Sequence, residues 1–135
     1  MKNLSKNSIV LINPYQLKPH EKISISRAIY ILFKIILVGN FTVPLLVDSK
    51  TKTIIDGHHR CWVAKKLKFK SVPCYCVDYL SDQSIRVHPR RANISVDKME
   101  VINMALGDNL FPRKTTRHEY KIPVFKSLSL GELWK

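Results

Sequence analysis

The feature that most constrains the fold is a strand that runs into a helix through a single glycine. The segment 53–55 is β-branched throughout, and 61–67 places its apolar residues on one helical face. Between them stand Asp56, Gly57, His58, His59 and Arg60. The first N–H groups of a helix have no intrahelical partner, and the helix dipole adds positive potential there. The junction therefore predicts a phosphate-binding turn that the histidines and Arg60 could complete.

Asp56 has two interpretations at this junction. Aspartate is a common helix N-cap or turn residue, and that role would be structural. A carboxylate beside a phosphate could instead bind a metal ion or accept a proton. The residues of the turn leave both interpretations open.

The remaining hydrophobic pattern predicts a mixed α/β fold. Strands are expected at 8–12, 41–48, 53–55, 71–79 and 85–88, and helices at 23–38, 61–68 and 95–106. Gly39 and Gly107 are expected to end the first and last helix, and Ser95 to cap the last one. A chain of 135 residues has the length of one domain, so we expect residues 1–135 to form a single compact unit with a mixed sheet.

The formal net charge of +13 favours an anionic ligand but does not identify it. The basic residues are spread along the chain, without a helix-turn-helix pattern or interleaved aromatic residues, so nucleic acid is not the expected partner. The apolar run around 29–38 contains Lys34 and is too short for a membrane span, and 1–7 is not a signal peptide. These features predict a cytoplasmic protein without a membrane partner, and they carry no signal for an oligomeric state.

The cysteines agree with a reducing location. Cys74 and Cys76 are too close for ordinary disulfide geometry, and no second pair provides zinc ligands. We expect buried strand thiols. Cys61 follows Arg60 near a helix N-terminus, where a thiolate would be stabilised, but a packing role is favoured.

A second polar segment lies near the C-terminus. Residues 112–118 read Pro-Arg-Lys-Thr-Thr-Arg-His. By itself such a segment is most often a solvated basic loop. Its functional interpretation is a second anion pocket, in which hydroxyls donate and Arg117 clamps a carboxylate or phosphate.

The turn 56–60 resembles the signature of the ParB/sulfiredoxin superfamily. Together with Pro19-His20-Glu21 upstream and the segment 112–118 downstream, the Asp-Gly-His-His-Arg form is similar to the free L-serine kinases of archaea and their siderophore-cluster relatives in bacteria. The chain departs from that family's pattern in having Arg113 where a second proline is usual and His88 where an aromatic residue is expected. The first departure affects loop stiffness, and the second affects packing beside the substrate.

The resemblance implies a ParB/sulfiredoxin-like domain that transfers a phosphoryl group from ATP, or from ADP, to the hydroxyl of free L-serine. The product, O-phospho-L-serine, would serve cysteine biosynthesis. By this analogy Glu21 is the general base and Asp56 orients the hydroxyl or holds Mg²⁺. The nucleotide phosphates would be bound by Gly57, His58, His59 and Arg60. Serine would be bound by Thr115, Thr116, Arg117 and His118.

Two alternatives use the same superfamily turn. A ParB-like DNA-binding or nucleotide-dependent module without kinase activity would agree with the net charge, although no helix-turn-helix pattern follows the turn. A sulfiredoxin-like reductase would carry a cysteine inside the turn, where this chain has His58. Taken alone, Glu21 could also be a helix-start acid that only balances the dipole.

Overall fold

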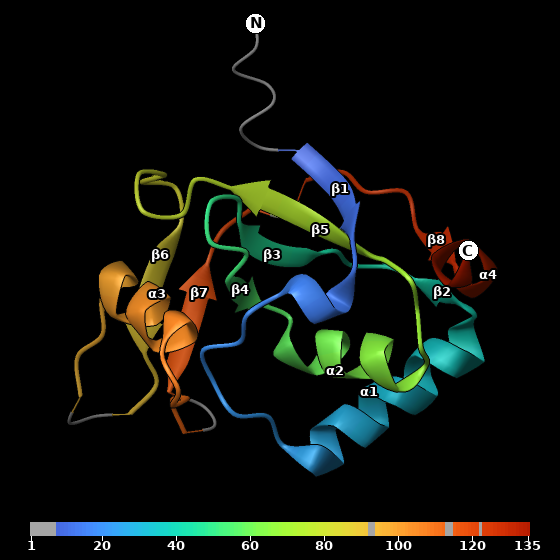
Figure 1. Cartoon of the computed structure of the whole chain (residues 1–135), viewed down its shortest axis with the longest axis horizontal. Coiled ribbons are helices and arrows are strands. Elements are labelled where there is room, and N and C mark those ends of the chain that lie inside the picture. The colour runs from blue at the N-terminus through green and yellow to red at the C-terminus, as the bar shows by residue number, and fades with distance from the viewer. Residues whose placement is uncertain (1–7, 92–93, 113–114, 122) are drawn as a thin grey trace, which may run out of the picture.

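The computed structural model describes residues 8–91, 94–112, 115–121 and 123–135. At its centre is a four-stranded mixed sheet in the order β1-β5-β3-β4 (Figure 1). The strands are β1 Ser8–Ile12, β3 Leu45–Asp48, β4 Ile54–Asp56 and β5 Val72–Val77. β3 and β5 are parallel, whereas the β1–β5 and β3–β4 pairs are antiparallel. The predicted mixed sheet is therefore confirmed.

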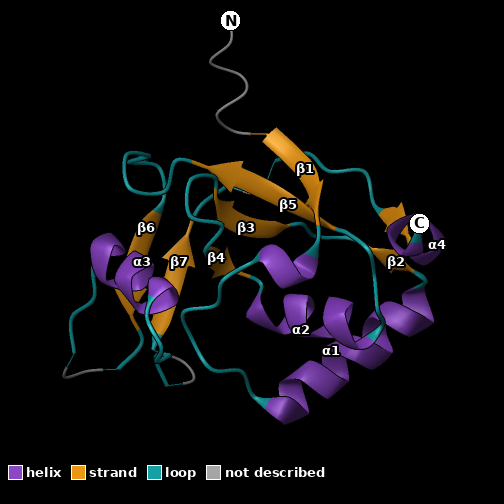
Figure 2. Cartoon of the chain, viewed as in Figure 1, coloured by secondary structure: helices purple, strands orange, loops and turns teal. Residues whose placement is uncertain are grey.

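Helices and short strands surround this sheet (Figure 2). The helices are α1 Ile25–Val38, α2 His58–Lys66, α3 Lys98–Leu106 and α4 Leu130–Trp134, with a 3-10 turn at Pro14–Gln16. The short strands are β2 Asn40–Phe41, β6 Arg86–Pro89, β7 Thr116–Glu119 and β8 Leu128–Ser129. β2 pairs with β8, and β6 pairs with β7. Within the described residues no helix has both the length and the apolar character that a membrane crossing requires.

The strand β3 is buried on both faces because its side chains alternate between two apolar clusters. Leu45 and Val47 of β3 pack with Ala64 of α2 in one cluster. The intervening Leu46 packs with Val101 of α3 in the other. α1 and α2 thus lie on one side of the sheet, and α3 lies with β6 and β7 at the other (Figure 1). The edge strand β4 runs directly into α2, so this junction is held between the two clusters.

Several predicted boundaries are confirmed. α1 ends at Gly39, whose φ of 81° is the left-handed conformation expected for its C-cap. The hairpin between β3 and β4 forms, and Asp48 closes it by accepting hydrogen bonds from the amide and hydroxyl of Thr51. Cys74 and Cys76 are buried free thiols on β5. Burial raises the pKa of the Cys61 thiol, which supports the packing role for that residue.

Three expectations were wrong. The single strand at 41–48 is two strands, because the chain leaves β2 after Phe41 and only enters the sheet after Pro44. α2 begins at His58 rather than Cys61, which brings the polar turn into the helix. Ser95 does not cap α3; Asp97 does, in a capping box with Glu100. β7, β8 and α4 were not predicted, and Arg113 and Lys114 lie outside the described residues.

Candidate functional site

The predicted turn forms one wall of a cavity of about 520 Å³. Gly57 is the N-cap of α2 with a φ of 109°, and within the described chain no side chain caps this helix. The amides of its first turn are therefore left for a ligand. An N-cap role for Asp56 is excluded, because Gly57 occupies that position and the Asp56 carboxylate instead accepts a 2.7 Å hydrogen bond from the Tyr120 hydroxyl.

The cavity is strongly cationic. Among the described residues, its walls carry six lysine or arginine side chains and two carboxylates, those of Glu21 and Asp56. The cations are Lys22, Arg27, Lys34, Arg60, Arg90 and Arg117. An excess of this kind in a concave site attracts a polyanion, and the open N-terminus of α2 adds to the attraction.

Arg60 is fixed by the protein before any ligand binds. Its Nη1 donates to the carbonyl oxygens of Val43 and Pro44 at 3.2 and 3.3 Å, and its Nη2 lies 4.0 Å from Asp56. Only 19% of its side chain is exposed. The guanidinium is thus held in position beside the helix terminus, as charge-assisted binding of an anion requires.

The two histidines of the turn hold neighbouring loops through their ring nitrogens. The backbone N–H of His20 donates to His58 Nε2, and the backbone N–H of Ser24 donates to His59 Nε2, both at 3.1 Å. In each neutral ring the proton therefore sits on Nδ1. His59 ties the start of α2 to the N-cap of α1, so its part in the site is at least partly structural.

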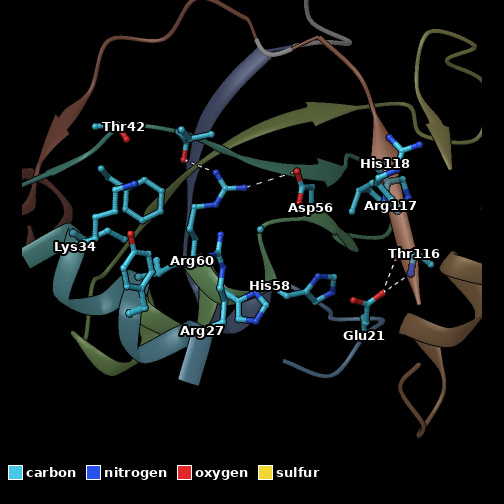
Figure 3. A pocket seen from close by; sticks show the side chains of 18 of the residues that line it. Glu21, Arg27, Lys34, Thr42, Asp56, His58, Arg60, Thr116, Arg117 and His118 are labelled. Carbon is cyan, nitrogen blue, oxygen red and sulfur yellow. Dashed lines mark hydrogen bonds and ion pairs between the residues drawn. The ribbon is translucent and has the colours of Figure 1, made fainter. Parts of the chain in front are cut away.

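Glu21 enters the cavity from the loop before α1 and meets β7. Its Oε1 accepts hydrogen bonds from the amide of Thr116 at 2.9 Å and from the Thr116 hydroxyl at 2.8 Å. Figure 3 shows Glu21, Asp56, Thr116 and Arg117 toward one end of the cavity and Lys34 and Thr42 toward the other, with Arg27 and Arg60 between them. The structure thus brings together all but one of the residues predicted for the site.

Thr115 is the exception. It is 3% exposed, its hydroxyl donates to the Pro112 carbonyl oxygen, and it does not line the cavity. Thr115 precedes β7 and turns its hydroxyl to the Pro112 carbonyl oxygen, whereas Thr116, Arg117 and His118 of β7 all line the cavity. The polar segment 115–118 is a paired strand and its approach, not a solvated loop.

Sequence reasoning missed Arg27, Tyr30, Lys34 and Tyr120. Three of them follow one face of α1 with a spacing of three and four residues, and that helical period was available in the sequence. Tyr120 carried no comparable signal, because its contact with Asp56 depends on how β7 is placed.

Burial keeps three histidines around the site neutral. Desolvation lowers the pKa of His20 to about 4 and that of His118 to about 3, and it lowers the pKa of His58 well below the ordinary value. Their rings are close to one another: the His20 centroid lies 4.6 Å from that of His58 and 5.9 Å from that of His118. Protonating two of these histidines would therefore place two positive charges close together, which is unfavourable.

We expect the free energy of unfolding to fall as the pH drops below about 6.5. The unfolded chain binds protons at His20, His58 and His118 in that range, whereas the folded chain does not, so protonation favours unfolding. Each such histidine contributes about 1.4 kcal/mol per pH unit below its unfolded pKa. Urea denaturation at several pH values between 7.5 and 5 measures the slope. A His118→Asn variant should show a shallower slope; equal stability at pH 7.5 and 5 would contradict the assignment.

No protein-family model matches the chain. A ParB-like protein of Sulfolobus acidocaldarius is 31% identical over 80 residues, which cover 59% of this chain and 40% of that protein. An ATP-dependent L-serine kinase of Staphylothermus marinus is 33% identical over 82 residues, covering 58% of this chain and 32% of that protein. The chain thus spans less than half the length of these curated relatives.

A solved structure of a free serine kinase in complex with AMP superposes with a TM-score of 0.83 at 18% identity, covering 95% of this chain and 94% of the other. At that identity the superposition establishes the fold. The resemblance expected from the three motifs is confirmed: proteins named as L-serine kinases are sequence relatives of this chain, and a free serine kinase shares its architecture.

Proposed function

We propose that this chain is a free L-serine kinase that transfers a phosphoryl group from a nucleotide to the serine hydroxyl. The single observation that carries the proposal is the arrangement of one cationic cavity between two groups of residues: the open α2 terminus with Arg60, and Glu21 held against β7. Phosphoryl transfer needs charge neutralisation, alignment and a proton acceptor more than it needs covalent chemistry.

The phosphates would bind at the first turn of α2. The amides of His58, His59 and Arg60 would donate to them, and the Arg60 guanidinium would neutralise charge. Arg27 and Lys34, which line the same cavity from α1, would extend this cationic surface. Relatives named as ATP-dependent L-serine kinases support ATP as the donor, while solved free serine kinases hold AMP or ADP.

Serine would lie at the end of the cavity formed by Glu21 and Arg117. The guanidinium of Arg117 suits the serine carboxylate. The Glu21 carboxylate would receive the hydroxyl proton. The Asp56 carboxylate, which is oriented by its hydrogen bond from Tyr120, would orient the serine hydroxyl or hold Mg²⁺. O-phospho-L-serine made in this way would supply cysteine biosynthesis.

Mg²⁺ fits this site as a companion of the nucleotide. Among the described residues no group of three His, Cys, Asp or Glu side chains converges on a metal position. Mg²⁺ commonly takes one or two carboxylates together with substrate phosphates, and Asp56 could supply one such ligand. When bound, the ion would neutralise charge on the transferred phosphoryl group.

Incubation with L-serine, Mg²⁺ and either ATP or ADP, followed by detection of O-phosphoserine, tests the proposal. We expect product with at least one donor, and more with ATP. Folded protein that forms no product with either donor would refute the kinase. Sequence-specific binding to duplex DNA in that case would favour the ParB-like alternative, whereas DNA binding that falls steeply with salt would report only the basic surface.

A further inference from the structure

The hydroxyl of Thr116 lies between two hydrogen-bond acceptors. Its Oγ1 is 2.8 Å from Glu21 Oε1 and 3.1 Å from His20 Nε2. His20 is completely buried, and its other ring nitrogen, Nδ1, lies 2.8 Å from the carbonyl oxygen of Ile54. A carbonyl can only accept, so Nδ1 carries the proton and donates it.

The protonation of His20 then decides what Nε2 can do. With its pKa lowered to about 4 by burial, His20 is neutral near pH 7, and its one ring proton is on Nδ1. The rings of His58 on α2 and His118 on β7 pack against the same ring, and burial outweighs the hydrogen bond to Ile54 and the charge of Asp56 on β4, both of which favour the protonated form. Nε2 is therefore a buried lone pair that needs a donor.

A hydroxyl has one proton, so Thr116 cannot donate to Glu21 and His20 at once. With the Glu21 carboxylate ionised, the hydroxyl donates to the charged oxygen, and from the described part of the chain His20 Nε2 then faces the oxygen lone pairs of Thr116. The contacts Ile54–His20–Thr116–Glu21 contain three links but only two hydrogens. The network is one proton short.

We propose that the Thr116 hydroxyl is a two-position switch through which His20 assists Glu21 in accepting the substrate proton. This inference rests on the proposed kinase function and adds two positioning residues to it, Thr116 and His20. It also gives Thr116 a different part from the serine contact that the family resemblance implies.

The serine hydroxyl oxygen forms a bond to the transferred phosphorus, the bond from phosphorus to the leaving nucleotide oxygen breaks, and the serine proton passes to the Glu21 carboxylate. Neutral Glu21 is a weaker acceptor, so the Thr116 hydroxyl turns to His20 Nε2. The Thr116 amide still donates to Glu21 Oε1. When Glu21 takes up the proton, it loses the hydrogen bond from the Thr116 hydroxyl. The buried His20 Nε2, which would otherwise be unsatisfied, gains that hydrogen bond.

Replacing Thr116 by valine tests the switch, because valine keeps the shape and removes the hydroxyl. We expect kcat to fall by roughly tenfold or more, with little change in KM for serine or nucleotide. Thr116→Ser keeps the hydroxyl and should restore most of kcat. Thr53→Val is the matched control: Thr53 is also buried, its hydroxyl bonds to Thr51 at 2.7 Å, and it lies outside the cavity, so the kcat of this variant should stay near the native value.

A double-mutant cycle separates the switch from a structural effect. His20→Asn keeps a donor near the Nδ1 position and removes Nε2, so it should lower kcat by an amount similar to Thr116→Val. If the two residues act together, the double variant is no slower than the slower single variant. Thermal unfolding of each variant checks that it is folded.

The inference and the kinase proposal fail in different ways. Native protein that makes no O-phosphoserine overturns the kinase. An active native enzyme whose Thr116→Val variant keeps its kcat, or raises only KM for serine, overturns the switch, since the hydroxyl would then be dispensable or a substrate contact. Losses that multiply independently in the double variant would overturn it as well. If His20→Asn does not fold, the kcat of Thr116→Val decides alone.

Discussion

Replacing Glu21 by glutamine is expected to lower kcat for phosphoryl transfer by about 10²- to 10⁴-fold, the usual contribution of a general base. The change is nearly isosteric. The glutamine amide oxygen can still accept from the Thr116 amide and hydroxyl, which Glu21 now does at 2.9 and 2.8 Å. The wall of the cavity should therefore stay in place while the proton acceptor is lost. Single-turnover formation of O-phosphoserine measures the chemical step directly.

Nucleotide affinity provides the control within the same variant. Arg60 and the α2 terminus are untouched by the change, so the Kd for ATP or ADP should remain within a few-fold of native. Glu119→Gln is a matched control on β7: its carboxylate is exposed, pairs with His88 at 3.0 Å and lies outside the cavity, so turnover should be unaffected. A Glu21→Gln enzyme that turns over at the native rate would remove Glu21 from the role of base.

Replacing Gly57 by alanine is expected to lower the free energy of unfolding by about 2–5 kcal/mol, from backbone strain together with overpacking. The φ of 109° is unfavourable for any residue with a Cβ atom. A Cβ at this position would also lie 2.8 Å from Leu45 Cγ and 3.0 Å from Arg60 Nη2. Because Leu45 is a fully buried residue of β3, a shift of the turn or of Leu45 is needed to relieve the shorter contact, and the Arg60 guanidinium is displaced as well. Nucleotide affinity should fall together with stability.

Gly39→Ala separates these contributions. Gly39 has a φ of 81°, but a Cβ there would meet nothing within 4 Å. The Gly39→Ala variant should lower the free energy of unfolding by about 1–2 kcal/mol, because alanine must adopt the left-handed conformation. Nucleotide binding should be unchanged. Urea denaturation and nucleotide titration of both variants make the comparison. If Gly57→Ala is no more destabilising than Gly39→Ala and binds nucleotide normally, the close contact at the turn has no energetic importance.

The sequence predicted local features well where one segment determined them. The glycine between a β-branched strand and an amphipathic helix indicated the β4–α2 junction, and Gly39 marked the end of α1. Asp97 and Glu100 have the spacing of a capping box, so the sequence also indicates that Asp97 caps α3, two residues after the predicted cap Ser95. The prediction of one strand at 41–48 is wrong because this segment is apolar along most of its length. The pattern gives no sign that its first part, β2, pairs with β8 and its second part, β3, pairs with β5.

The C-terminal part of the site could not be read in the same way. β7 is a short polar strand, Thr116–Glu119, without the apolar alternation that indicates a strand. It exists because β6 pairs with it and because Glu21 accepts two hydrogen bonds from Thr116. The residues of segment 115–118 were recognised through a family resemblance, but only the fold distinguishes the cavity-lining Thr116 from the buried Thr115. Their roles in catalysis stay predictions.

The bond between Glu21 and Thr116 also bears on how the protein reaches its working state. These two residues are 95 positions apart, whereas the β4–α2 junction that would hold phosphate is formed by neighbours in the chain. Closing so long a loop carries a large entropy cost, and such contacts form late in folding. The proposed nucleotide-binding surface can therefore assemble early, while Glu21, the proposed base, meets β7 only when nearly the whole chain is in place. Catalytic activity would therefore appear only in molecules in which nearly the whole chain has folded.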